Sequence, residues 1–199
     1  ILRGKLWEAF AAETQTVLSP LCEALAVAHA RNIVHRDVKA SNVMVCGERV
    51  VLLDFGIAKI SDAFAIELTA TNQSLGTPTS MAPEQILGRA VDGRTDVYAL
   101  GCLAFHALTG RIPFVEDSNT MVQHLHLHAR RPRASEVAPV GSDVDDVLVR
   151  AMAIDAAARF ATPRAFVDAL ASCTVRQPTA LAMTTPQVAP PVASEPAPR

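Results

Sequence analysis

The sequence predicts a mainly α-helical domain that contains one small β-hairpin. Apolar residues recur at the three- and four-residue spacing of a helix in several separate segments. Only one stretch, residues 43–53, holds two short β-branched runs separated by a turn. No internal repeat with a fixed period is visible. Half of the 199 residues are apolar and 19% are charged, which suits one well-buried domain rather than two.

The first predicted helix covers residues 13–29. Its apolar stripe is formed by Val17, Leu21, Leu25 and Ala28. Pro20 lies inside this pattern and would remove a helical hydrogen bond, so we expect a kink or a later start there. Asn32 follows the stripe and is a residue type that ends helices in the left-handed conformation.

The β-branched runs at residues 43–45 and 50–53 predict the hairpin, with its turn near Gly47 and Glu48. At the open end of this hairpin, Asn42 precedes the first strand and Asp54 follows the second. We therefore expect a carboxamide and a carboxylate to lie side by side.

The rest of the chain contains one long loop, four helices and a tail. Residues 61–79 are small and polar without a sustained period, and a loop of this length suggests function. Residues 95–108 are apolar on nearly every side, which predicts the central buried helix. Three further helices are predicted over residues 118–128, 142–152 and 163–170. The last begins with a Thr-Pro cap. Residues 174–199 are rich in Pro and Ala, and we expect a disordered linker.

Composition excludes several functional classes. The formal charge is −2 and no Lys/Arg cluster stands out, so neither nucleic acid nor anionic lipid is predicted as a partner. The four cysteines form no CxxC pair, so we expect reduced, buried thiols rather than zinc ligands or disulfides. No apolar stretch reaches membrane-spanning length and no signal peptide is visible. A cytoplasmic location is predicted for this chain, although the full-length protein could be anchored beyond residue 199.

Three motifs carry the chemistry. Residues 35–42 read HRDVKASN, residues 54–56 read DFG and residues 81–84 read MAPE. In this order and spacing they resemble the motif set of the protein kinases. Over residues 6–170 the chain is similar to the C-terminal lobe of bacterial, eukaryotic-like serine/threonine kinases. The resemblance implies a kinase catalytic domain over residues 1–173, a helical bundle whose hairpin carries the catalytic and metal-binding loops.

The resemblance also implies roles for four residues, and these roles suit a reaction that needs positioning and charge neutralisation more than covalent chemistry. Asp37 would accept or orient the proton of the substrate hydroxyl, and Lys39 would bring a positive charge to the phosphate transferred from ATP. Asn42 and Asp54 would hold Mg²⁺ through hard oxygen atoms. Considered singly, Asp37 and Asn42 could be turn residues, and Asp54 a strand-end cap.

The resemblance also implies a substrate class and a mode of regulation. Lys39 is typical of serine/threonine rather than tyrosine kinases, and Thr77 matches a threonine that such kinases hold against the catalytic residues. A simple turn is the alternative for Thr77. Arg36 resembles the arginine of kinases whose activation loop is ordered by phosphorylation. The expected phosphosites are Thr69 and Thr71, with Ser74 a weaker candidate.

Structural roles are implied for several other residues. His35 would pack under the catalytic loop and takes no part in catalysis. Asp96, a costly charge in an apolar helix, would hold the backbone of that loop. Glu84 would pair with Arg159. His124 and His128 share one helical face and invite a metal hypothesis. No third ligand has suitable spacing, however, and His126 points elsewhere, so solvated or partly packed histidines are predicted.

The sequence departs from the family pattern in three ways. The resemblance starts after the segment that joins the two kinase lobes, so the N-terminal β-lobe, with its glycine-rich loop, is expected to be absent from this chain. That missing lobe of the same polypeptide is then a partner, and the chain alone should bind ATP poorly. Ala40 replaces a common proline and Ser80 a common aromatic residue, which predicts modest destabilisation.

Three functions are compatible with these observations. The first is a non-specific serine/threonine protein kinase that phosphorylates protein substrates. The second is a non-catalytic, kinase-like docking or regulatory module, against which the intact catalytic residues argue. The third is a small-molecule phosphotransferase, which typically lacks the motif at residues 81–84.

Overall fold

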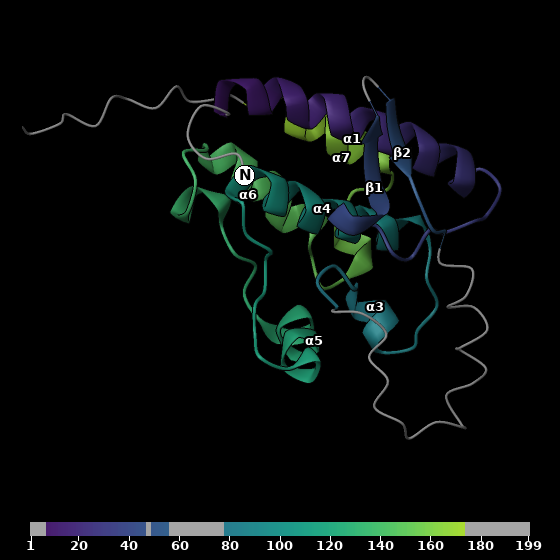
Figure 1. The fold of residues 1–199 in the computed structure, drawn as a ribbon. Coiled ribbons are helices and arrows are strands. Elements are labelled where there is room, and N and C mark those ends of the chain that lie inside the picture. Colours follow the sequence, from purple (N-terminus) through teal and green to yellow (C-terminus); the bar gives the residue numbers. More distant parts are fainter. Residues whose placement is uncertain (1–6, 47–48, 56–77, 174–199) are drawn as a thin grey trace, which may run out of the picture.

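The computed structural model describes residues 7–46, 49–55 and 78–173. The elements are α1 (Trp7–His29), β1 (Val43–Cys46), β2 (Arg49–Leu52), α3 (Pro83–Ile86), α4 (Gly93–Thr109), α5 (Asn119–His128), α6 (Ser142–Ala151) and α7 (Pro163–Ala171). Short 3-10 turns cover Ala40–Asn42, Ala134–Glu136 and Ala156–Ala158. Helices α1 and α7 pack side by side against α4, while α6 packs on another side of α4 (Figure 1). The mainly α class with one hairpin is confirmed.

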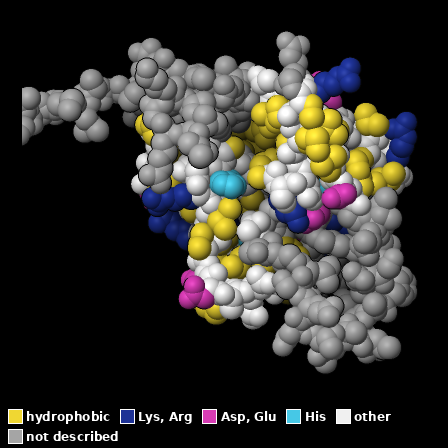
Figure 2. Space-filling view, viewed as in Figure 1, with side chains coloured by type: hydrophobic (Ala, Val, Ile, Leu, Met, Phe, Trp, Pro, Cys, Tyr) yellow, Lys and Arg dark blue, Asp and Glu magenta, His cyan; other side chains and the backbone are white. Residues whose placement is uncertain are grey.

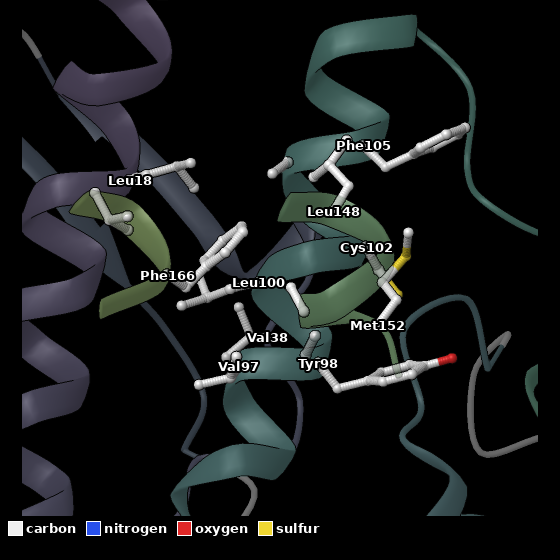
Figure 3. Packing of buried hydrophobic residues seen from close by; sticks show 14 of the residues in the cluster. Leu18, Val38, Val97, Tyr98, Leu100, Cys102, Phe105, Leu148, Met152 and Phe166 are labelled. Carbon is white, nitrogen blue, oxygen red and sulfur yellow. The ribbon is translucent and has the colours of Figure 1, made fainter. Parts of the chain in front are cut away.

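Helix α4 is the centre of the core, as the sequence predicts. Its residues Val97, Tyr98, Leu100 and Ala104 are fully buried, and side chains from α1, α6 and α7 converge on it (Figure 3). Gly101 explains how closely α6 approaches. A β-carbon at this position would lie 3.0 Å from the Cβ of Ala151 and 3.0 Å from the Cγ of Met152, so only glycine fits without displacing them.

Helix α1 corrects one prediction. The later start expected at Pro20 is wrong, because the helix begins at Trp7 and continues through Pro20 to His29. The helix buries Leu18, Leu21 and Leu25 against the core. Burial of such side chains contributes about 1.5–3 kcal/mol each, which outweighs the cost of about 3 kcal/mol for an interior proline. Asn32 has a φ of +58°, the left-handed conformation that its residue type predicts.

The hairpin forms with the predicted strands. Its register pairs Val43 with Leu52 and Cys46 with Arg49, which leaves Gly47 and Glu48 between the strands and outside the described residues. Burial alternates along β2, whereas in β1 only Val43 is half-buried and the three residues after it are exposed. Val43, Val50 and Leu52 pack against the core, whereas Met44, Val45 and Val51 are exposed. Hydrophobic side chains gather visibly over this part of the surface (Figure 2).

The remaining predictions about helices and cysteines have mixed outcomes. The three C-terminal helices are present, and Ser118 and Thr162 cap α5 and α7 by accepting hydrogen bonds from backbone N–H groups. All four cysteines are free. Cys22 and Cys102 are buried as predicted, but Cys173 is only half-buried, and the prediction is wrong for Cys46, which ends β1 and is exposed. Burial raises the pKa of the Cys102 thiol to about 12. None of the helices in the described ranges has the length and apolar character to cross a membrane. The predicted linker at residues 174–199 lies outside the described residues.

Candidate active site

Residues 35–42 connect α1 to β1 and hold most of the predicted site. Their backbone is strained, because Arg36 has a φ of +67° although it is not glycine. The fully buried carboxylate of Asp96, in the first turn of α4, holds this conformation. Its Oδ2 accepts a hydrogen bond from the backbone N–H of His35 at 2.9 Å, and its Oδ1 accepts one from that of Arg36 at 2.8 Å.

A third group completes the surroundings of Asp96. The Nε2 atom of His29, at the end of α1, lies 2.7 Å from Asp96 Oδ2. A buried carboxylate without partners would be costly, and these three contacts offset that cost. Asp96 therefore joins the end of α1, the start of α4 and the backbone of the loop at residues 35–42.

Asp37, Lys39 and Asn42 meet at one carboxylate oxygen. The Nζ of Lys39 lies 2.9 Å from Asp37 Oδ2. The Nδ2 of buried Asn42 donates to the same oxygen at 3.0 Å and to the backbone carbonyl of Asp37 at 2.8 Å. Because both of these bonds use the amide nitrogen of Asn42, its Oδ1 is left as the atom that can face a cation.

Asp54 lies at the open end of the hairpin, one residue beyond the residue that pairs with Asn42. Asn42 faces Leu53, whose backbone N–H donates to the carbonyl of Asn42 at 2.8 Å. Asp54 is exposed and has a φ of +52°. Buried His35 connects the two loops. Its Nε2 lies 3.0 Å from the carbonyl oxygen of Leu53, and its ring packs 4.6 Å from that of Phe55.

Two contacts from the segment after residue 77 were missed by the sequence argument. The hydroxyl of Ser80 donates to the carbonyl of Val38 at 2.8 Å, and Nε2 of Gln85 donates to the carbonyl of Arg36 at 2.8 Å. Gln85 also accepts a hydrogen bond from the N–H of Ala82 at 3.0 Å. The only signal in the sequence is a serine where an aromatic residue is usual, and that signal does not identify its partner.

Glu84 and Arg159 form a buried ion pair with two parallel hydrogen bonds of 2.8 Å. Thr95 donates a further bond of 2.7 Å to Glu84. Burial by itself raises the pKa of the Glu84 carboxyl, but the bonds from Arg159 and Thr95 outweigh it and hold that pKa below its usual value. The remaining N–H groups of Arg159 donate to the backbone carbonyls of Arg94, Ala153 and Ile154.

The histidines of α5 correct another prediction. His126 is fully buried rather than solvated or partly packed. Its Nδ1 lies 2.7 Å from the hydroxyl of Tyr98, and Arg131 donates to the same hydroxyl at 3.2 Å. Burial, and next the charge of Arg131, lower the pKa of His126 to about 4. The rings of His124 and His128 are 4.7 Å apart. Within the described ranges no three His, Cys, Asp or Glu side chains are grouped to hold a metal ion.

Some predicted positions are not described by the structure. Thr69, Thr71, Ser74 and Thr77 all lie within residues 56–77, outside the described residues. The structure thus brings together Asp37, Lys39 and Asn42, and positions Asp54 at the adjacent hairpin end. It also connects this group to α4 through Asp96.

Sequence comparison identifies the relatives of the chain. The model of the protein kinase domain family matches residues 6–170. The serine/threonine-protein kinase Pkn1 of Myxococcus xanthus is 44% identical over 161 residues, which cover 78% of this chain and 23% of that protein. PknF of Mycobacterium tuberculosis is 40% identical over 146 residues, which cover 71% of this chain and 30% of PknF. The chain therefore spans less than a third of the length of these relatives.

Comparison with solved structures agrees with this result. The crystal structure of the PknI kinase domain of Mycobacterium tuberculosis superposes with a TM-score of 0.62 at 33% sequence identity. The match covers 80% of this chain and 54% of the PknI chain. From its motifs, its helical bundle with one hairpin, and these relatives, we conclude that the chain belongs to the protein kinase family and has the fold of the C-terminal lobe.

Proposed function

We propose that this chain is the C-terminal lobe of a bacterial serine/threonine protein kinase that transfers the γ-phosphate of ATP to hydroxyl groups of protein substrates. The observation that carries the proposal is the meeting of Lys39 and Asn42 at Asp37 Oδ2, in a chain whose relatives are named serine/threonine-protein kinases. Nothing in the packing of the core requires a lysine, an aspartate and an asparagine at this one point.

In the proposed reaction, Asp37 orients the substrate hydroxyl and accepts its proton as the hydroxyl oxygen attacks the γ-phosphorus. The bond from that phosphorus to the bridging oxygen breaks, and ADP leaves. The hydrogen bond from Asn42 fixes the rotamer of Asp37, so the carboxylate is aimed before the substrate arrives. Lys39, which pairs with Asp37 here, has a long side chain that can turn to the transferred phosphate and offset its negative charge. Lys39 also favours serine and threonine as substrates, and Thr77 is assigned to the substrate-binding loop.

The residues present fit a magnesium ion. The amide oxygen of Asn42 and the exposed carboxylate of Asp54 are hard oxygen donors of the kind that Mg²⁺ prefers. When bound, Mg²⁺ neutralises charge on the phosphates of ATP. Asn42 contributes in a second way, because its amide nitrogen remains bonded to Asp37 while its oxygen is available to the ion. The ion site and the base are therefore coupled through one side chain.

Regulation by phosphorylation is proposed at Thr69 and Thr71. Its support is Arg36, whose Nε is buried and lacks a hydrogen-bond partner within the described part of the chain. An unpaired buried guanidinium N–H costs about 1–3 kcal/mol. A phosphate on the activation loop would accept hydrogen bonds from this guanidinium and remove that cost.

A partner lobe is proposed on the hairpin. Met44, Val45 and Val51 are 46%, 58% and 42% exposed, and hydrophobic side chains gather on the surface in the region of the hairpin (Figure 2). An N-terminal lobe of the same polypeptide would cover these side chains and complete the ATP site. Without it, the chain is expected to have weak activity or none. We propose a cytoplasmic location for the catalytic region.

The test uses the whole kinase, with both lobes. The variant Asp37→Asn keeps the shape of the side chain but removes the base, so phosphate transfer from labelled ATP to a basic protein should fall at least 100-fold. Phosphorylation of the peptide that contains Thr69 and Thr71, measured by mass spectrometry, should fall with it. The matched control is Asp117→Asn, the same change at an exposed position, which should leave transfer unchanged.

Two outcomes would argue against the proposal. Transfer retained by Asp37→Asn would refute the assigned base. If the unaltered whole kinase transfers no phosphate and yet binds a protein partner through this lobe, the non-catalytic docking function is the better explanation.

A further inference from the structure

We propose that Ser80 and Gln85 are positioning residues that clamp the catalytic loop from the side of the substrate-binding segment. This inference rests on the proposed kinase function for its catalytic consequence. The contacts themselves are independent of that function. Neither residue touches the reacting atoms in the proposed reaction. Both act on the backbone that carries Asp37 and Lys39.

The two hydrogen bonds grip the loop on both sides of Asp37. Gln85 donates to the carbonyl of Arg36, which belongs to the peptide that leads into Asp37. Ser80 donates to the carbonyl of Val38, which belongs to the peptide that leads into Lys39. Each side chain therefore fixes the orientation of the peptide group that directly precedes one charged residue, Asp37 or Lys39.

The backbone at this place needs such restraint. The left-handed conformation of Arg36 is costly for a residue with a β-carbon and persists only when neighbouring groups hold it. The carboxylate of Asp96 accepts a hydrogen bond from the N–H of Arg36, and Gln85 donates one to the carbonyl of Arg36. The two polar groups of one strained residue are thus bonded to two different elements, α4 and α3.

Gln85 is itself held in place by further hydrogen bonds within its own segment. The Oε1 of Gln85 accepts a hydrogen bond from the N–H of Ala82, so the orientation of its amide is determined from both ends. Its neighbour Glu84 is tied to Arg159 by two hydrogen bonds. A movement of residues 80–85 would therefore be passed to the peptides around Asp37 rather than absorbed by a loose side chain.

Ser80 also revises the prediction made from its residue type. An aromatic residue at this position would supply apolar contact, and its loss was expected to destabilise the segment. The serine instead supplies a donor on a side chain short enough to reach the Val38 carbonyl directly. One such bond contributes about 1 kcal/mol and costs more when a half-buried acceptor is left unpaired.

The first experiment measures the clamp without any reference to catalysis. Hydrogen–deuterium exchange is followed in the peptide covering residues 35–42 of the whole kinase. Ser80→Ala should speed exchange there about 5-fold, the effect of about 1 kcal/mol, and Ser80→Thr, which keeps the hydroxyl, should restore the slow rate. The matched control is Ser172→Ala, which removes a hydroxyl-to-carbonyl bond of 2.7 Å at the end of α7 and should leave this peptide unchanged.

A second variant separates the clamp from general destabilisation. Gln85→Glu keeps an oxygen that can accept from Ala82 but replaces the donor to Arg36 with an acceptor. Exchange in residues 35–42 should rise, while exchange in α7 (Pro163–Ala171) stays unchanged. Unchanged exchange in both Ser80→Ala and Gln85→Glu would overturn the proposal.

The third measurement tests the catalytic consequence. Ser80→Ala should lower kcat about 5-fold with the KM for ATP unchanged, because the clamp bonds to the peptides beside Asp37 and not to the proposed magnesium ligands Asn42 and Asp54. Ser80→Thr should recover most of the loss. A rise in the KM for ATP without a change in kcat would contradict a positioning role. If exchange responds as predicted but the unaltered kinase transfers no phosphate, the clamp stands and the proposed function fails.

Discussion

At the scale of single residues, the environment of Asp96 shows how a buried charge becomes useful. His29 reaches it only because residue 93 has no side chain. A β-carbon on Gly93 would lie 2.7 Å from Nδ1 and 2.9 Å from Cε1 of His29, closer than atoms can approach. The glycine at the first position of α4 therefore creates the space in which His29 meets the carboxylate.

Replacement of Gly93 by alanine should accordingly destabilise the protein. Alanine favours a helix over glycine by up to about 1 kcal/mol, but the clash displaces a ring bonded to Asp96. We expect the free energy of unfolding in urea to fall by about 1–3 kcal/mol. In a His29→Ala background the clash is gone, so Gly93→Ala should be neutral or stabilising. Equal destabilisation in both backgrounds would exclude the close approach as the cause.

At the scale of elements, α5 is attached to α4 by a small polar cluster rather than by a broad apolar face. Tyr98 from α4, His126 from α5 and Arg131 after α5 share hydrogen bonds. Arg131 also lies 5.2 Å from the centre of the Phe114 ring. Because the hydroxyl of Tyr98 accepts from Arg131, it donates to Nδ1 of His126, which requires a neutral imidazole.

This cluster predicts loss of stability in mild acid. The pKa of His126 is about 4 in the folded protein and 6.5 without burial. Between these pH values the unfolded chain binds a proton that the folded chain does not, so stability falls as the pH is lowered. The loss attributable to His126 is about 1.4 kcal/mol per pH unit across that window. In His126→Asn the free energy of unfolding in urea should depend less on pH between pH 6.5 and pH 4 than it does in His124→Asn. His124 is an exposed residue on the same helix and serves as the control. Identical pH profiles for the two variants would contradict this assignment.

At the scale of the whole molecule, the Glu84–Arg159 pair joins residues 75 positions apart in sequence. It connects α3, which carries Gln85, to the segment after α6 and to the first turn of α4. The guanidinium is fully buried and each of its donors is used. Its geometry therefore matters more than its charge.

Replacement of Arg159 by lysine tests this connection. Lysine keeps the positive charge but lacks the planar guanidinium group, so several backbone carbonyls lose their hydrogen-bond donor. Breaking a buried pair in this way costs about 3–5 kcal/mol, which should appear as a lower urea midpoint. The matched control is Arg164→Lys, since Arg164 pairs with Asp168 on the surface, and no measurable change is expected there. A similar loss in both variants would mean that burial is not the deciding factor.

Much of the fold could be predicted because local patterns and tertiary packing agree. The all-round apolar character of α4 predicts its central place, and the Thr162-Pro163 pair predicts the start of α7. The hairpin follows from two β-branched runs and a two-residue connection. Of the candidate site, the motifs identify Asp37, Lys39, Asn42 and Asp54 as neighbours along short, regular stretches of chain.

The features that the sequence predicted wrongly or missed share a physical cause, which is contact between residues far apart in the chain. Pro20 stays within α1 because burial of distant contacts offsets a local cost. His126 is buried because Tyr98, Phe114 and Arg131 arrive from three separate segments. The contacts of Ser80 and Gln85 depend on where the carbonyls of Val38 and Arg36 point.

By itself, the sequence determines the family, the order of the elements and the identity of the chemical groups, because these depend on residue type and local spacing. Only the tertiary structure decides which groups share a hydrogen bond. Hydrogen bonds such as those to Arg36 and Val38 act over about 3 Å, and their partners lie 49 and 42 residues away along the chain.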